Sequence, residues 1–176
     1  MHLDCNLTWK SHLHNLIKKL SPICLMLRKL LPILNVKMAQ MVYCAHFYSQ
    51  ISCGITFWGS SSSTRKVFII QKRAIRILLR LGPKSSCREG FKKLVTLTVP
   101  CLYSYALMLT GVKNLNIYKT ISSVHAMNTR QQNRLRIPLV WLSSIQRSVY
   151  YSSVKIFSFH KIYFNFITIY TLLRLC

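Results

Sequence analysis

Acidic side chains are almost absent from this sequence. Asp4 and Glu89 are its two carboxylate residues, whereas lysine and arginine together number 25, and the formal net charge is +23. Only a couple of internal ion pairs can therefore form, and a compact chain with this charge repels itself. Protein surfaces normally mix both signs, so the imbalance favours an anionic partner, either a nucleic-acid backbone or an acidic membrane surface.

Cysteine pairs with metal-binding spacing are missing as well. The seven cysteines are an odd number spread along the chain, no signal peptide precedes them, and no two have the spacing of a zinc knuckle. We therefore expect reduced thiols in an intracellular protein, nuclear or cytoplasmic and not secreted. The sequence predicts no metal site and no cofactor for this chain.

Uninterrupted apolar runs of membrane-spanning length are also lacking. Windows 38–64 and 94–112 are nearly uncharged, but the first contains several serines and glutamines and the second contains Pro100. The uncharged run 162–173 near the C-terminus has twelve residues, whereas a helical span needs about 20. We expect no membrane span.

What the sequence does contain is a helical pattern over its first 116 positions. Hydrophobic residues recur there at steps of three and four, the period of an α-helix. Pro22 is expected to kink or split the first helix, and Gly82-Pro83 to end the third. The predicted elements are a short strand over 2–8, helices over about 10–30, 36–53, 64–81 and 100–114, and a short helix within 85–94.

The expected fold is therefore mainly α. A helical region covers 1–116, and a basic and aromatic connecting region covers 117–176 and ends in a weakly ordered tail. The second region is rich in tyrosine, phenylalanine and isoleucine from 148 onward and has a polar stretch near 128–134.

The helix predicted over 64–81 separates apolar from basic side chains. At 100° per residue, each group falls within an arc of roughly 100–120°, on opposite sides of the helix. The expected packing residues are Val67, Ile70, Ala74, Ile77, Leu78 and Leu81. The candidate nucleic-acid-binding residues are Arg65, Lys66, Lys72, Arg73, Arg76 and Arg80, with Lys18, Lys19, Arg28 and Lys29 as secondary contacts. The alternative is that this arc is only the solvated side of an amphipathic helix.

Segment 48–81 also carries two short motifs. Gly54-Ile55 precedes Trp58-Gly59, and the helix that follows serines 60–63 reads Gln-Lys-Arg-Ala-Ile-Arg over 71–76. This sequence resembles the segment after the polymerase core in insect jockey-type non-LTR retrotransposon reverse transcriptases. That segment typically reads Tyr-Gly-Ile-x-x-Trp-Gly and then Gln-Lys-Arg-Ala-x-Arg. Similar matches extend over most of the chain and include Leu7-Thr8-Trp9-Lys10, Cys87-Arg88 and Leu97-Thr98-Val99-Pro100.

The resemblance implies a thumb-like helical array without a catalytic palm. In this family, an RNA-directed DNA polymerase, two magnesium ions are held by aspartates of an aromatic-x-Asp-Asp motif. Neither Asp4 nor Glu89 lies in such a motif, so the chain is expected to have no catalytic residue and to start inside an element of the family's pattern. The implied function is that of a mobile-element fragment which contributes template-primer backbone binding with low sequence specificity.

Two other interpretations of the whole chain remain open at this point. One is a small basic membrane-associated protein that uses 94–112 and the aromatic tail, and the other is a decayed element copy with no selected function. Phe57 and Trp58 likewise have two interpretations. They either pack the loop against the helices or stack on an exposed base.

Overall fold

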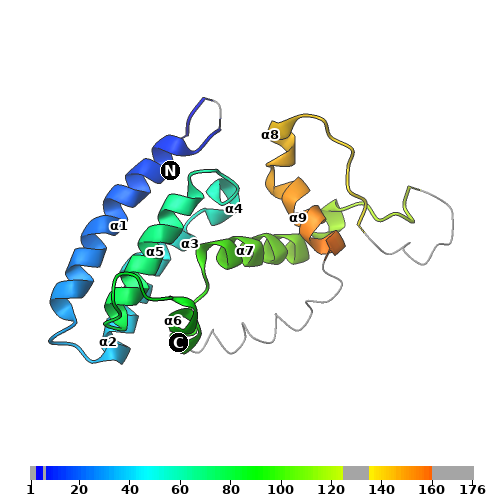
Figure 1. Ribbon diagram of the computed structural model, residues 1–176. Helices are drawn as coiled ribbons and strands as arrows, with labels where there is room; N and C mark the ends of the chain where they lie inside the picture. The colour runs from blue at the N-terminus through cyan, green and yellow to red at the C-terminus, as the bar shows by residue number, and fades with distance from the viewer. Residues whose placement is uncertain (1–2, 6, 125–134, 160–176) are drawn as a thin grey trace. The chain divides into compact units, whose positions relative to one another are not determined.

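The computed structural model describes residues 3–5, 7–124 and 135–159, and these are mainly helical (Figure 1). The mainly α fold expected from the sequence is confirmed. The weakly ordered tail expected at the C-terminus falls on 160–176, outside the described residues. The elements are α1 Lys10–Leu30, α2 Val36–Val42, the π-helix η1 Tyr43–Tyr48, α3 Ser49–Ser52, α4 Ile55–Trp58, α5 Thr64–Leu78, α6 Arg88–Lys93, α7 Val99–Lys113, the 3-10 helix η2 Leu115–Ile117, α8 Ser143–Gln146 and α9 Val149–Phe159.

The chain divides into two compact units, Met1–Tyr103 and Ser104–Cys176. The division lies inside α7, whereas the sequence pattern placed the change near residue 116. Periodicity cannot show such a boundary, because α7 is one continuous helix and its first turn is bonded to α5 of the first unit through Val99.

The expected strand over 2–8 is not present among the described residues of that segment. Asp4 instead organises a turn: its carboxylate accepts hydrogen bonds from the hydroxyls of Thr8, at 3.0 Å, and Ser11, and its carbonyl accepts one from Leu7 N–H at 2.9 Å. The bond from Ser11 is the main cause that lowers the pKa of Asp4. A strand needs a neighbouring strand for its backbone groups, and the described part of the first unit provides none.

The first long helix forms over the predicted range and is not split by Pro22. Proline lacks the N–H that would bond the carbonyl four residues earlier. Packing nevertheless keeps α1 continuous, because one face of it is buried along its whole length. The buried residues of α1 are Leu13, Leu16, Leu20, Cys24 and Leu27.

The core of the first unit forms where α1, α5 and the helical stretch 36–52 meet. Figure 1 shows α1 and α5 side by side, and Tyr43 and Phe47 of η1 stack with ring centroids 5.1 Å apart in this core. Trp58 is fully buried, and its indole N–H donates to the carbonyl of Cys53 at 3.0 Å. The buried residues of α5 are Val67, Ile70, Gln71, Ala74, Ile75 and Leu78.

The C-terminal end of α5 differs from the expected stop at Gly82-Pro83. The helix ends at Leu78, and Arg80 takes a left-handed conformation with φ 53°. Leu81 N–H then donates to the carbonyl of Arg76 at 2.9 Å, and Arg80 N–H donates to that of Ile77 at 3.0 Å. This is the Schellman pattern, in which glycine usually supplies the left-handed residue. Here an arginine occupies that position, two residues before the glycine.

The second unit contains most of α7, together with η2, α8 and α9. Its described residues form a small cluster in which Tyr118 and Tyr150 stack at 5.1 Å and the hydroxyls of Tyr118 and Ser153 lie 2.8 Å apart. Trp141 lies outside this cluster, with 95% of its surface exposed.

Gln71 is the buried polar side chain that joins three parts of the first unit. Its amide nitrogen donates to the Tyr43 hydroxyl at 3.2 Å and to the Leu97 carbonyl at 2.9 Å, and its oxygen accepts from Val99 N–H at 2.9 Å. Burial also raises the pKa of Tyr43, so its hydroxyl stays protonated. One side chain of α5 therefore holds both η1 and the start of α7.

We expect Gln71→Leu to lower the free energy of unfolding by about 2–5 kcal/mol, because it leaves the Val99 N–H and its other partners unsatisfied. Chemical denaturation measures this. The matched control is Gln50→Leu, which replaces an exposed glutamine of α3 and is expected to change stability by no more than about 0.5 kcal/mol. Equal losses in the two variants would contradict the role assigned to Gln71.

Gly59 allows the side chain of Tyr103 to lie directly against the backbone. A Cβ atom at Gly59 would lie 2.1 Å from Cδ2 of Tyr103, whereas one at Gly82 would meet no heavy atom within 4 Å. We expect Gly59→Ala to destabilise the fold by about 1–3 kcal/mol through overpacking. Gly82→Ala should instead stabilise it by about 0.4–1 kcal/mol by restricting the unfolded chain. Melting temperatures that fall equally in both variants would refute this contrast.

Candidate nucleic-acid interface

Five of the six basic residues predicted as a nucleic-acid contact lie on α5, outside its buried arc, and the sixth, Arg80, lies in the turn that follows the helix. By helical angle, the buried residues of α5 span an arc of about 140°, and its five basic residues span about 120° on the opposite side. Arg65, Lys66, Arg73 and Arg80 are exposed, and Lys72 and Arg76 are half-buried. We call these six residues the basic face.

The buried arc differs in detail from the predicted one. Ile77 is half-buried and Leu81 is 38% exposed, whereas Gln71 and Ile75 are fully buried. Gln71 was missed because a polar residue does not count in an apolar pattern. Its helical angle was the available signal, since it falls between those of Val67 and Ile75.

Three members of the basic face are engaged by the protein itself. The Lys72 ammonium lies 4.3 Å from the centre of the Phe68 ring, a cation–π contact. Arg76 Nε donates to the Ser85 carbonyl at 3.0 Å, and Arg80 Nη2 donates to the Leu31 carbonyl at 3.1 Å. Arg80 thus ties the end of α5 to the end of α1, and Arg76 holds the loop that leads to α6.

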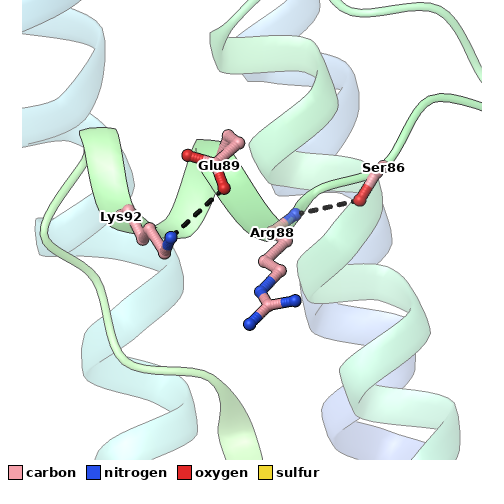
Figure 2. Close-up of polar contacts among 4 residues, drawn as sticks. All are labelled: Ser86, Arg88, Glu89 and Lys92. Carbon is pink, nitrogen blue, oxygen red and sulfur yellow. Dashed lines mark hydrogen bonds and ion pairs between the residues drawn. The ribbon is translucent and has the colours of Figure 1, made fainter.

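The remaining members of the basic face, Arg65, Lys66 and Arg73, are not engaged in this way. In the described part of the chain, none of the three makes a hydrogen bond or ion pair through its side chain, and all three are exposed. Both carboxylates are occupied elsewhere. Asp4 accepts bonds from Thr8 and Ser11, and Glu89 pairs with Lys92 at 3.2 Å on α6, as Figure 2 shows.

The pair in Figure 2 does little to balance the charge of the molecule. Both side chains are mostly exposed, and such surface pairs contribute at most about 1 kcal/mol. The nearby guanidinium of Arg88 extends away from Glu89, and the dashed line at Arg88 marks its backbone N–H, which donates to the Ser86 hydroxyl at 3.4 Å. The positive charge of the described surface of the first unit is therefore largely uncompensated.

The four secondary contacts on α1 are all exposed, but they do not lie together. By helical angle, Lys18 and Lys29 point about 160–180° away from the centre of the buried side of α1, and Lys19 lies about 100° from it. Arg28 flanks the seam with α5, and it lines a surface depression there together with Arg73. The structure thus brings one of the four to the basic face.

The two aromatic residues of the Phe-Trp-Gly motif have different environments. Trp58 is fully buried and packs the loop, so its face cannot stack on a base. Phe57 is 51% exposed, and its ring lies against Trp9 with centroids 6.2 Å apart.

Residues suited to bind a metal ion do not cluster in the described ranges: no group of three histidine, cysteine or carboxylate side chains lies together there. Six cysteines in these ranges are free thiols, and Cys24 and Cys87 are buried. Desolvation raises the pKa of Cys24, partly offset by the nearby charges of Arg73 and Arg28.

We expect Arg80→Ala to lower the free energy of unfolding by about 1–2 kcal/mol, because the charged donor to Leu31 is lost. Arg80→Gly loses the same bond but relieves the left-handed backbone, so it should be about 1 kcal/mol more stable than Arg80→Ala. Arg65→Ala is the control and should stay within about 0.5 kcal/mol of the parent chain. Urea denaturation that ranks Arg80→Gly below Arg80→Ala would contradict this interpretation.

Comparisons with known proteins give no relative: no family model, no curated protein and no solved structure matches this chain.

Proposed function

We propose that the chain binds the phosphate backbone of a nucleic-acid duplex through the exposed residues of the basic face. In this proposal it is a thumb-like fragment of a retrotransposon reverse transcriptase that lacks the catalytic palm. The observation that carries the proposal is the set of exposed cations Arg65, Lys66 and Arg73, which have no carboxylate partner in the described structure.

The charge of the whole chain supports a polyanionic ligand. At a formal net charge of +23, folding brings like charges together, and an anionic ligand relieves their repulsion. Neutralised phosphates release condensed counterions, which adds a sequence-independent driving force.

The kind of contact follows from the residue types. Lysine and arginine on a helix side bind phosphate and sugar groups and fix the position of a duplex without reading its bases. Low sequence specificity is therefore part of the proposal. DNA synthesis is not, because the parent enzyme's magnesium-binding aspartates have no counterpart in the sequence.

The alternative is a small basic membrane-associated protein. Among the described residues, no helix combines the length and the hydrophobicity needed to cross a bilayer. The resemblance of 48–81 to reverse transcriptases favours nucleic acid.

A salt titration of duplex binding tests the proposal. We expect log affinity to fall linearly with log salt, by about 0.9 per phosphate contact. A triple variant, Arg65→Gln, Lys66→Gln and Arg73→Gln, should reduce that slope by up to about 2.7. The control triple, Lys18→Gln, Lys19→Gln and Lys29→Gln, removes the same charge from other sides of α1 and should change the slope much less.

Equal reductions in the two triple variants would mean that binding follows net charge and not the basic face, which contradicts the proposal. Two duplexes of unrelated sequence should bind with similar affinity. Anionic vesicles that bind the chain when duplex does not would support the membrane alternative instead.

A further inference from the structure

A depression of about 200 Å³ lies at the seam between α1 and α5. Two arginines line it, one from each helix, together with a serine, a cysteine and two aliphatic residues. The lining residues are Ser21, Cys24, Leu25, Arg28, Arg73 and Ile77.

The depression holds positive charge without a counter-charge from the described protein. Neither Arg28 nor Arg73 has an ion-pair partner there. Cys24 is buried and its pKa is raised, so its thiol is neutral at pH 7, and the Ser21 hydroxyl donates to the Ile17 carbonyl at 3.0 Å. Two like charges at one hollow are unfavourable unless an anion lies between them.

The chemistry of the lining suits a phosphate group. Guanidinium presents a planar fork of donors that matches two phosphate oxygens. Leu25, which is 59% exposed, and the half-buried Ile77 complete the lining. The size and the mixed lining fit one phosphate and not an extended apolar ligand.

The two arginines are also held in a fixed relation by the fold. Cys24 and Leu27 of α1 are buried in the same core as Ala74 and Leu78 of α5. The bond from Arg80 to the Leu31 carbonyl joins the two helices at the same end. The backbone positions of the two arginines at the depression are therefore fixed relative to one another.

We propose that this hollow binds one phosphodiester of the bound strand, shared by Arg28 and Arg73, and that it sets the register of the duplex along the basic face. The assignment of this phosphate to a nucleic-acid strand rests on the proposed function. The hollow itself is a phosphate site whether or not the phosphate belongs to a strand.

Salt slopes distinguish a shared phosphate from two separate ones. Arg28→Gln and Arg73→Gln should each reduce the slope by less than about 0.9, because the remaining arginine still contacts the phosphate. The double variant should reduce it by about 0.9, because only one phosphate contact is lost. The matched control is the pair Arg65→Gln and Lys66→Gln, whose combined reduction should be about 1.8. A reduction of about 1.8 in the Arg28 and Arg73 double variant would overturn the shared site.

A conservative variant adds a second readout. Arg73→Lys keeps the charge but loses the fork, so duplex affinity should fall severalfold while the salt slope stays that of the parent chain. Unchanged affinity would show that Arg73 contributes only net charge, which also overturns the site.

Inorganic phosphate separates the hollow from the proposed function. At constant ionic strength with chloride as reference, phosphate should raise the melting temperature of the parent chain and of the Arg65 and Lys66 variant, but not that of the Arg28 and Arg73 double variant. If duplex does not bind and phosphate still does so, the proposed function fails and the site stands. If duplex binds and phosphate shifts all three proteins equally, the site fails and the proposed function stands.

Discussion

The packing of α5 against α1 determines where every charged side chain of α5 can lie. Val67, Ala74 and Leu78 must be buried for the first unit to have a core, and the 3.6-residue period then turns the lysines and arginines outward as one group. No separate interaction is needed to group the five basic residues of α5. They form the exposed side of an amphipathic helix whose other side is buried.

Charge imbalance gives those side chains two different roles. Where carboxylates are scarce, backbone carbonyls are the acceptors that remain, and Arg76 and Arg80 donate to carbonyls at Ser85 and Leu31. These two cations contribute bonds to the fold as well as charge. Arg65, Lys66 and Arg73 contribute charge alone, so they remain available to a ligand. The residues of the basic face look equivalent in the sequence. The positions of nearby backbone carbonyl groups decide which of them bond within the protein and which remain available.

The elements of the fold that depend on local spacing could be predicted from the sequence. The long helix over 10–30 and the helical stretch beginning at Val36 follow directly from the three-and-four spacing, since burial of one side dictates it. The left-handed turn at Arg80 could not be predicted, because glycine was available two residues later and local preference favours it. Gln71 was missed for another reason: its partners Tyr43, Leu97 and Val99 are distant in sequence. Arg28 and Arg73 line the same depression because of how α1 and α5 pack. The spacing of residues within one helix cannot predict that packing.

The contrast between Trp58 and Trp141 has a practical consequence for spectroscopy. The indole of Trp58 is buried in the first unit, and its N–H donates to the Cys53 carbonyl. The indole of Trp141, in the second unit, has 95% of its surface exposed. Light emission from the first indole shifts to longer wavelength when its surroundings become aqueous, whereas that of the second is already at the wavelength typical of water. The half-buried Trp9 also lies in the first unit. A fluorescence spectrum recorded during unfolding therefore reports mainly on the first unit and little on the second.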